Sequence, residues 1–500
     1  MASWAGFSFE TKTPGDADPS ARVLALVGVF VAAFALEPAA KAPEGDTSSE
    51  WRIPPRATPP HVTLEWHTPL GFVGMARFLI EGGTPLRGEI TPAGNKNEAL
   101  PLIAASLLTD DPVTLHNVPR IRDVRGMLEI ASALGAKVEE LDGHSVRVTG
   151  ALKSTEVPAS LAKEIRASLL FAGPLLGRYK KVRLGRPGGD VIGRRRNDTH
   201  FLALRALGAE LDLSSGGYGM HTAGLSGTEI LLDEPSVTAT ENALMAAVLA
   251  KGRTVIRNAA SEPHVQQLGI ALMKMGARIV GIGTNTITID GVERLKGVEH
   301  TILSDHMEVG SLIGAIAMTH GDAIIRNAVP DHMRMTRLVF KRLGVETKVE
   351  GDSIHVPAQE RFVIEHDLGG AIPRVQSQIW PGFPSDLTSI ATAMATQSEG
   401  TVVIHEWMFE GRLYFADALS REMGARIILS DPHRAVVIGP SQLYAAELRS
   451  PDIRAGMALL AATLCAKGTS VINGVEQIDR GYEELDGRLR ALGAKIERAA

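Results

Sequence analysis

The chain has 500 residues, of which 44% are hydrophobic and 22% are charged, a balance typical of globular proteins. This length exceeds the usual size of a single hydrophobic core, so two or more domains are predicted. The net charge of -5 disfavours a general nucleic-acid binder, and the single cysteine, Cys465, excludes an intrachain disulfide framework and a cysteine-rich metal site.

Residues 1–74 differ in composition from the rest of the chain. Residues 23–36 (VLALVGVFVAAFAL) are apolar, but this run is shorter than the ~20 residues that a membrane span needs. Its length suits the core of a signal peptide, yet the preceding segment is acidic rather than basic, and the following RIPPRATPPH is typical of a linker. Organised periodicity begins at Met75. We therefore expect residues 1–74 to be an extension that is disordered or, if Met75 is the start codon, not translated.

From Met75 onward, one short phrase of the form Leu/Met-Gly-Ala/Val recurs. Its six copies start at Leu134, Leu207, Met275, Leu343, Met423 and Leu492. Each copy ends a stretch with apolar residues at helical spacing, so the glycine is expected to close a helix in the left-handed conformation. A second phrase, seen as KGRTVIRNA, HGDAIIRNA and EGTVVIHEW, predicts a turn and a strand. Six such α/β units predict two domains of three units each, with a substrate cleft between them.

Lys96 and Asn97 lie in GEITPAGNKNEALP, after a glycine-containing turn and before an apolar helix. A lysine there can hold an anion together with the helix N-terminal amides. A solvated surface lysine is the alternative interpretation.

Several segments in this order resemble the enolpyruvyl transferases of cell-wall synthesis. They are TPAGNKNEALP, HNVPRIRDV, EIRASLLFAGPLL, the start of PGGDVIGRRRNDTH, FPSDLTS and QIDRGYEELDGRLRALGAKIE, and the resemblance covers residues 75–500. It implies an α/β fold of two inverse α/β-barrel domains, each with three βαβαββ units, and a cleft between them. The N-terminal strand would join the C-terminal domain. We therefore expect a first domain of residues 96–302 and a second of residues 75–95 plus 303–500, with crossings near Lys96 and Leu303.

The resemblance also implies a reaction and its substrates. The enolpyruvyl group of phosphoenolpyruvate would pass to the 3′-hydroxyl of UDP-N-acetylglucosamine with release of phosphate, without metal or organic cofactor, as the first committed step of peptidoglycan precursor synthesis. Phosphoenolpyruvate carries a carboxylate and a phosphate, and guanidinium forks bind both groups well. The implied phosphoenolpyruvate-binding residues are Lys96, Asn97, Arg195, Arg412 and Arg454. Arg166, a further candidate cation, is assigned to UDP-N-acetylglucosamine together with Asp198, Ser236, Val237, Asp386 and Phe409.

Three residues are implied to be catalytic: Lys96, Asp190 and Asp386. Asp386 matches the family's base for the sugar hydroxyl; a helix N-cap is the alternative role, and both can hold. Asp190 stands where many relatives have a cysteine that acts as general acid, and to donate a proton its pKa would have to be raised. Its glycine-rich loop predicts a lid over phosphoenolpyruvate, an ordinary surface turn being the alternative. Because a carboxylate is a poorer target for epoxides than a thiolate, we expect insensitivity to fosfomycin.

The nucleotide side departs from the family pattern. Asp198 and His200 match it, but Arg196, Asn197 and Thr199 do not, Thr238 replaces a usual glycine, and Leu170 stands where many members have tryptophan. These departures leave open an enolpyruvyl transferase that acts on another nucleotide, such as UMP. A second alternative is a catalytically silent paralogue that binds the nucleotide sugar and regulates its pathway.

The remaining expectations concern hinge, metal and location. Asp305 is interpreted as structural or hinge-associated. His116, His200 and His264 lack metal-ligand spacing, so no metal site is predicted. Both implied substrates are cytoplasmic metabolites, so we expect a cytoplasmic enzyme with no nucleic-acid or membrane partner; the sequence leaves its oligomeric state open.

Overall fold

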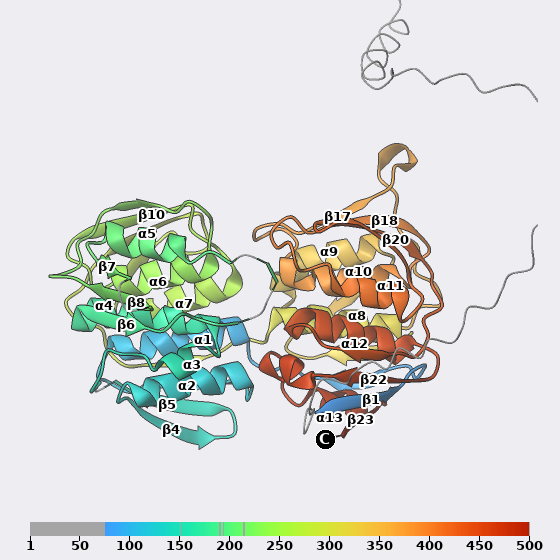
Figure 1. The fold of residues 1–500 in the computed structure, drawn as a ribbon, viewed down its shortest axis with the longest axis horizontal. Helices are drawn as coiled ribbons and strands as arrows, with labels where there is room; N and C mark the ends of the chain where they lie inside the picture. Colours follow the sequence, from blue (N-terminus) through green and yellow to red (C-terminus); the bar gives the residue numbers. More distant parts are fainter. Residues whose placement is uncertain (1–75, 151, 190–191, 194, 214–215, 500) are drawn as a thin grey trace, which may run out of the picture. The chain divides into compact units, whose positions relative to one another are not determined.

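The computed structural model describes residues 76–499 except 151, 190–191, 194 and 214–215. These residues belong to one compact unit. Its described residues fold into six small sheets with helices packed on them, around two hydrophobic cores (Figure 1). We call the elements from α1 (Lys96–Ala105) to β13 (Val298–Thr301) the first half, and all other described elements the second half.

The first half contains three sheets. Their strand orders are β13–β3–β5–β4, β6–β8–β7 and β11–β12–β10–β9. The strands are β3 (Val113–His116), β4 (Lys137–Asp142), β5 (Ser145–Thr149), β6 (Lys181–Leu184), β7 (Glu210–Asp212), β8 (Tyr218–His221), β9 (Glu229–Leu231), β10 (Arg253–Arg257), β11 (Arg278–Val280) and β12 (Thr286–Asp290). The helices after α1 are η2 (Ser106–Leu108), α2 (Arg122–Ala133), α3 (Ala159–Ala162), η3 (Arg166–Phe171), α4 (Ala172–Tyr179), α5 (Asp198–Ala206), α6 (Val237–Ala247) and α7 (Pro263–Lys274).

The second half also contains three sheets. Their strand orders are β15–β16–β14–β2, β17–β18–β20–β19 and β21–β22–β1–β23. The strands are β1 (Arg77–Glu81), β2 (Arg87–Ile90), β14 (Asp322–Ile325), β15 (Lys348–Glu350), β16 (Ser353–Val356), β17 (Arg374–Gln376), β18 (Gly400–His405), β19 (Arg426–Asp431), β20 (Arg434–Gly439), β21 (Glu447–Arg449), β22 (Thr469–Asn473) and β23 (Lys495–Ala499). The helices are α8 (His306–Met318), η4 (Pro330–Met333), α9 (Arg334–Arg342), η5 (Leu368–Gly370), η6 (Ser385–Leu387), α10 (Thr388–Ala395), α11 (Phe415–Arg421), α12 (Ile453–Cys465), η7 (Val475–Arg480) and α13 (Leu485–Ala491).

The order β9–α6–β10–α7–β11–β12 shows the expected βαβαββ unit. β9 pairs in parallel with β10, whereas β12 pairs antiparallel with both β10 and β11. The predicted α/β class and its repeated units are therefore confirmed.

The repeated glycine closes a helix in each unit. Gly135, Gly208, Gly276, Gly344, Gly424 and Gly493 all have positive φ, between 83° and 106°. At the end of α2, the amide of Ala136 donates to the carbonyl of Ala131 at 3.1 Å, and that of Gly135 donates to Ser132 at 2.9 Å. This pattern satisfies the last carbonyls of the helix and turns the chain toward the next strand, as the sequence predicts.

Two kinds of helix alternate along the chain. All residues of α8 are buried, and α8, α10 and α12 pack on one another in the core of the second half. A helix that is apolar on all sides belongs in such a position. In contrast, α9 buries only Thr336 and Phe340. Within the described parts of residues 76–499, no helix is long and apolar enough to cross a membrane.

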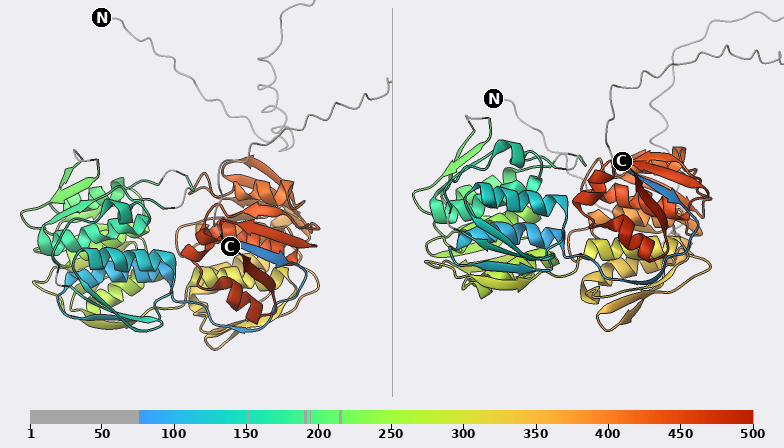
Figure 2. Two further views of the ribbon diagram at one scale, coloured as in Figure 1. Left: turned by 60° about the horizontal axis from the view of Figure 1, so that its bottom comes forward. Right: turned by 90° about the horizontal axis from the view of Figure 1, so that it is seen from below.

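The chain crosses between the two halves twice, each time directly after a strand that stays in the half it leaves. β2 immediately precedes α1 but pairs with β14, and β13 precedes α8 but pairs with β3. The crossing segments lie side by side, because the amide of Asn95 donates to Leu303 at 2.7 Å and that of Asp305 donates to Ala93 at 2.9 Å. In addition, β1 lies between β22 and β23, as Figure 2 shows. We retain residues 96–302 and 75–95 plus 303–500 as the proposed domains.

Candidate active site

Asp386 lies between two arginines of the second half. It is the middle residue of η6, the single turn that precedes α10. Its Oδ1 accepts a hydrogen bond from Nη2 of Arg412 at 3.0 Å, and its Oδ2 accepts one from Nε of Arg454 at 3.0 Å. The arginine side chains are 3% and 7% exposed, whereas that of Asp386 is 31% exposed, so the acid is fixed yet accessible to a substrate. No side chain caps α10, so the helix N-cap interpretation of Asp386 is wrong.

The charges around Asp386 keep it ionised. Desolvation alone would raise its pKa, but the positive charges of Arg454 and Arg412, with a contribution from Lys96, hold the pKa well below its ordinary value of 3.8. Burial alone would lower the pKa of Arg454, but Asp386 raises it well above its usual range. As long as both arginines stay on this carboxylate, it is a very weak base.

Arg454 is held by groups from three segments. It is the second residue of α12, and its amide donates to Oδ1 of Asp452, the N-cap, at 2.8 Å. Its Nη1 donates to Oη of Tyr482 at 3.3 Å, and its guanidinium carbon lies 5.5 Å from the centre of the Tyr482 ring. The Tyr482 hydroxyl lies 2.8 Å from Oγ of Ser311 on α8. The guanidinium group therefore has a defined position before any substrate arrives.

Lys96 and Arg480 share one carboxylate, Asp123. Nζ of Lys96 lies 2.6 Å from Oδ2 of Asp123, while Nε and Nη2 of Arg480 donate to its two oxygens at 3.0 and 3.3 Å. Lys96 and Asp123 belong to α1 and α2 of the first half, whereas Arg480 ends η7 of the second half. Burial alone would raise the pKa of Asp123, but the two cations lower it overall. This cluster therefore joins the two halves through buried charge.

The amides at the start of α1 are already hydrogen-bonded. Asn95 caps the helix by accepting from the amides of Asn97 and Glu98, and the amide of Lys96 donates to Oδ2 of Asp305 at 3.2 Å. The expectation that these amides hold an anion together with Lys96 is therefore wrong; only the Lys96 side chain remains as the candidate. Asp305 in turn caps α8, in agreement with a structural role at the crossing.

Arg166 and Arg195 form a second cationic site in the first half. Arg166 begins η3 and donates to the backbone carbonyls of Arg195 at 3.3 Å and Arg196 at 2.6 Å. Desolvation and the nearby charge of Arg195 lower the pKa of Arg166 to about 10. Within the described residues, no carboxylate forms an ion pair with Arg166. Two neighbouring guanidinium groups in this setting favour an anionic ligand.

The other expected binding residues occupy defined but more dispersed positions. Ser236 caps α6 by accepting from the amide of Ala239 at 3.4 Å, and Val237 is the first residue of that helix. Asp198 begins α5. In the second half, the guanidinium carbon of Arg412 lies 5.3 Å from the centre of the Phe409 ring. Asn97, directly after Lys96, is half-buried.

The loop that follows β6 reaches the second half. Asp190 itself lies outside the described residues. Farther along, Ile192 is buried, and its carbonyl accepts from the amide of Gly411 at 3.0 Å, next to Arg412. The described part of this loop therefore meets the turn that carries Arg412.

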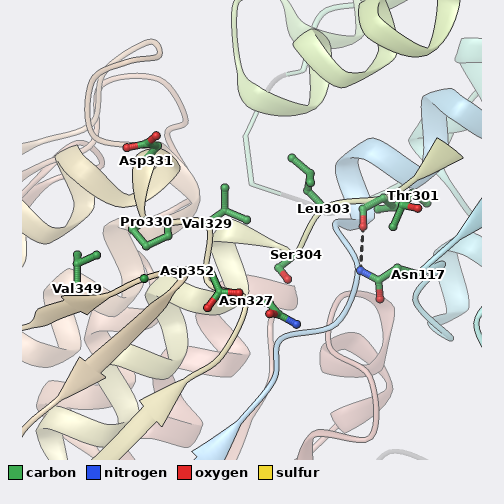
Figure 3. Close-up of a pocket in the computed structure, with 12 residues that line it drawn as sticks. Asn117, Thr301, Leu303, Ser304, Asn327, Val329, Pro330, Asp331, Val349 and Asp352 are labelled. Atoms are coloured by element: carbon green, nitrogen blue, oxygen red, sulfur yellow. Dashed lines mark hydrogen bonds between the residues drawn. The ribbon is translucent and has the colours of Figure 1, made fainter. Parts of the chain in front are cut away.

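A pocket of about 520 Å³ lies beside the crossing segments rather than at these clusters (Figure 3). Asn117, Leu303, Ser304, Asn327, Asp331 and Asp352 are among its lining residues, and none of the site residues predicted from the sequence lines it. We therefore place the candidate site at the arginine clusters, where charge and accessible acid meet. Among the residues that the structure describes, no group of three or more His, Cys, Asp or Glu is placed to hold a metal ion.

Comparisons with known proteins identify the family. Residues 80–489 match the family model described as EPSP synthase (3-phosphoshikimate 1-carboxyvinyltransferase). The chain is 52% identical to the UDP-N-acetylglucosamine 1-carboxyvinyltransferase of Treponema denticola, covering 85% of this chain and 99% of the relative. It is 51% identical to the protein of the same name from Bradyrhizobium diazoefficiens, covering 84% and 98%. The chain belongs to the UDP-N-acetylglucosamine 1-carboxyvinyltransferase family.

Solved structures agree on the fold of this carboxyvinyltransferase family member. The enolpyruvyl transferase NikO from Streptomyces tendae superimposes with a TM-score of 0.76 at 24% identity, over 85% of this chain and 99% of that one. EPSP synthase from Acinetobacter baumannii gives 0.67 at 18% identity, over 85% and 100%. The predicted family and its fold are thus confirmed.

The segment that departs from the family pattern contains its own network. Arg196 donates to Asp233 at 2.7 Å and to Asp198 at 3.3 Å, and the Thr199 hydroxyl also donates to Asp233 at 2.7 Å. The side chain of Arg196 therefore pairs with Asp198 at the start of α5 and with Asp233 between β9 and α6. These contacts stabilise the turn that presents the Arg195 and Arg196 carbonyls to Arg166.

His200 is a buried core histidine in this carboxyvinyltransferase. Its Nε2 lies 2.9 Å from Oγ1 of Thr238 and its Nδ1 lies 2.9 Å from Nδ2 of Asn242. Burial and the charge of Arg166 lower its pKa to about 3, so it is neutral at physiological pH. The threonine that replaces the usual glycine therefore provides a hydrogen-bond partner for this ring.

Sequence reasoning missed Asp123 and Arg480. Arg480 lies inside QIDRGYEE, a segment that carries the family resemblance. This resemblance could have identified Arg480 as a candidate site residue. Asp123 also lies in such a segment, HNVPRIRDV, but it stands at the start of a helix, where an acid is ordinarily explained by the helix dipole. Only the fold shows that it meets cations from both halves.

Proposed function

We propose that this chain transfers the enolpyruvyl group of phosphoenolpyruvate to the 3′-hydroxyl of UDP-N-acetylglucosamine and releases phosphate. The observation that carries this proposal is the 52% identity to a UDP-N-acetylglucosamine 1-carboxyvinyltransferase along 99% of that protein's length. The cationic clusters around Asp386 and Asp123 fit the same chemistry. The reaction would be the first committed step of peptidoglycan precursor synthesis, in the cytoplasm and without a metal or organic cofactor.

Phosphoenolpyruvate would bind by competing for cations that now hold protein carboxylates. Lys96, Arg412, Arg454 and Arg480 are all engaged by Asp123 or Asp386. The substrate brings both a phosphate and a carboxylate, and each can bind a guanidinium fork through two charge-assisted hydrogen bonds. When they draw Arg412 and Arg454 away from Asp386, the pKa of this acid rises toward its ordinary value. Substrate binding would thus convert a very weak base into a usable one.

The chemical step then balances within the site. A proton added to the methylene carbon of phosphoenolpyruvate makes C2 electrophilic, and the 3′-oxygen forms a bond to C2 as Asp386 takes the hydroxyl proton. The C2–O bond to phosphate breaks and phosphate leaves with the proton held by Asp386. The group that protonated the methylene carbon takes one methyl proton back, which restores the double bond. We assign the acid that serves the methylene carbon to Asp190, whose loop would close over the substrate. Arg195 would add positive charge on the same side.

The nucleotide sugar would lie along the first half, with its diphosphate near Arg166 and the start of α6. Arg166 has no carboxylate partner among the described residues, and Ser236 and Val237 lie at a helix N-terminus, where partial positive charge favours anions. Asp198 and Phe409 would complete the contact from α5 and from the Arg412 turn.

The test is phosphate release from phosphoenolpyruvate by the full chain, with UDP-N-acetylglucosamine or UMP as acceptor. Release only with UDP-N-acetylglucosamine is expected. Phosphate release only with UMP would show that the enzyme uses another acceptor, in another pathway. Release with neither acceptor would contradict the proposed reaction.

A further inference from the structure

Glu406 is a fully buried carboxylate to which the proposed reaction assigns no role. It follows β18 directly and has 0% exposure. Its backbone is fixed, because its amide donates to the His433 carbonyl at 2.8 Å and its own carbonyl lies 2.7 Å from Nδ1 of His433. Within the described residues, no ion pair joins Glu406 to a cation. Isolated buried carboxylates are costly, so an unpaired one requires compensation by hydrogen bonds.

Four donors supply that compensation, two to each oxygen. Oε1 accepts from the Ser377 hydroxyl at 3.0 Å and from the Met408 amide at 2.9 Å. Oε2 accepts from the hydroxyls of Ser385 at 2.8 Å and Thr388 at 3.0 Å. An ionised carboxylate only accepts, so it fixes the direction of all four hydrogen bonds.

Three of the four donors belong to the two segments that build the Asp386 site, and the fourth, Ser377, directly follows β17. Ser385 and Thr388 flank Asp386 on either side, in η6 and at the start of α10. Met408 begins the turn that continues to Phe409 and Arg412. The same carboxylate thus fastens the segment that carries the acid to the segment that carries its arginine partner.

We propose that Glu406 is a positioning residue that sets the location of Asp386 relative to Arg412 during enolpyruvyl transfer. This inference rests on the proposed function. Glu406 contacts neither substrate nor reacting atoms, and it acts through the two segments it joins. A displacement of about 1 Å in a catalytic group costs on the order of 100-fold in rate. Loss of this carboxylate is therefore expected to reduce kcat far more than substrate affinity.

The neutral isostere tests the direction of the hydrogen bonds. In Glu406→Gln, the amide nitrogen must donate, so the Ser385 and Thr388 hydroxyls have to turn round and accept, while the Met408 amide keeps its acceptor. We expect kcat to fall about 10- to 100-fold and KM for both substrates to change less than about 3-fold. Glu406→Ala should lose more, so Gln should partly rescue Ala. A matched control is Ser398→Ala, which removes a buried hydroxyl in the same half that donates to Leu343 at 2.7 Å; its kcat should stay within about 3-fold of the original.

A combined variant tests whether Glu406 acts through Asp386. If it does, adding Glu406→Gln to Asp386→Glu should lower kcat much less than it lowers kcat in the unaltered chain. Losses that simply multiply would overturn the proposal, and so would an unchanged kcat in Glu406→Gln. These measurements use whichever acceptor supports turnover by the unaltered chain.

Hydrogen exchange gives a readout that does not depend on turnover. In Glu406→Gln, backbone amides of residues 385–388 and 407–412 should exchange faster together, whereas Ser398→Ala should leave both segments unchanged. Faster exchange in only one segment, or in neither, would overturn the inference. If the unaltered chain releases no phosphate, the proposed function fails, and the coupling of the two segments is still decided by exchange.

Discussion

Asp123 accepts hydrogen bonds from Arg480 at 3.0 and 3.3 Å, although these residues are far apart in sequence and belong to different halves of the chain. Both are buried, and Lys96 completes the cluster at 2.6 Å. Lys96 and Arg480 are therefore held beside the same carboxylate before any substrate binds. It also fixes η7 of the second half against α2 of the first.

Arg480→Gln should therefore weaken phosphoenolpyruvate binding. We expect KM for phosphoenolpyruvate to rise at least about 10-fold, because hydrogen bonds to charged groups contribute about 1.5–3 kcal/mol. The KM for the nucleotide sugar should change much less. Steady-state phosphate release checks this, with Arg334→Gln as control, since Arg334 forms an exposed pair with Asp331. Equal effects on both substrates would contradict a specific role for Arg480.

Asp386→Asn should reduce kcat by about 100- to 10,000-fold, the usual range for removal of a general base. The amide keeps the size of the side chain but cannot take the hydroxyl proton. Phosphate release at saturating substrates measures the effect. Asp331→Asn is the matched control, because it makes the same chemical change at an exposed site. A fall in kcat of less than 10-fold would show that Asp386 is not the base.

The sequence could predict the repeats because local physics determines them. The glycine after each helix adopts a positive φ, a backbone conformation that other residues avoid. Gly135 and Gly493 are two examples. The family motifs similarly indicated Lys96, Arg412 and Arg454. Local sequence patterns could not predict which side chain pairs with each of these charged residues.

Asp386 illustrates this limit. At the sequence level, an acid before an apolar helix is a reasonable N-cap, yet in the structure two arginines from distant segments bind it. Glu406 shows the same limit, since its four donors come from residues 377, 385, 388 and 408. Long-range hydrogen bonds of this kind depend on the register of several strands at once, and no periodicity encodes them.

Buried histidines predict a distinctive dependence of stability on pH. Burial is the main cause that lowers the pKa of His200, His264 and His306 from 6.5 to about 3. Between these values the unfolded chain binds protons that the folded chain does not, so acidification favours unfolding. Each histidine should lower the free energy of unfolding by up to about 1.4 kcal/mol per pH unit as pH falls from 6.5 toward 3.

Urea unfolding at pH 6.0 and 5.0 checks this expectation. His264→Gln should reduce the loss of unfolding free energy between these two pH values, whatever its stability at neutral pH. His221→Gln, at an exposed histidine that lies 3.3 Å from Glu210, should not reduce the loss. Equal losses in His264→Gln and the unaltered chain would show that His264 is already protonated in the folded state.

Thr238→Val should destabilise the first half through His200. Valine has nearly the shape of threonine but cannot hydrogen-bond to Nε2 of His200, which lies 2.9 Å from the Thr238 hydroxyl. A buried polar atom left without a partner costs about 1–3 kcal/mol. The free energy of unfolding should fall by that amount, and Thr238→Ser, which keeps the hydroxyl, should recover most of it. If valine and serine behave alike, the hydroxyl does not stabilise this ring.

Fosfomycin should not inactivate this chain, whereas Asp190→Cys should make it sensitive. Epoxide opening needs a soft nucleophile, and a thiolate in the family's position provides one. The natural cysteine cannot substitute, because burial raises the pKa of Cys465 to about 12 and leaves almost no thiolate at neutral pH. Time-dependent loss of phosphate release should appear only in Asp190→Cys, and Cys465→Ser should not change the result. Inactivation of the unaltered chain, with the label on Asp190, would show that this carboxylate is itself a strong nucleophile in a strongly desolvated setting.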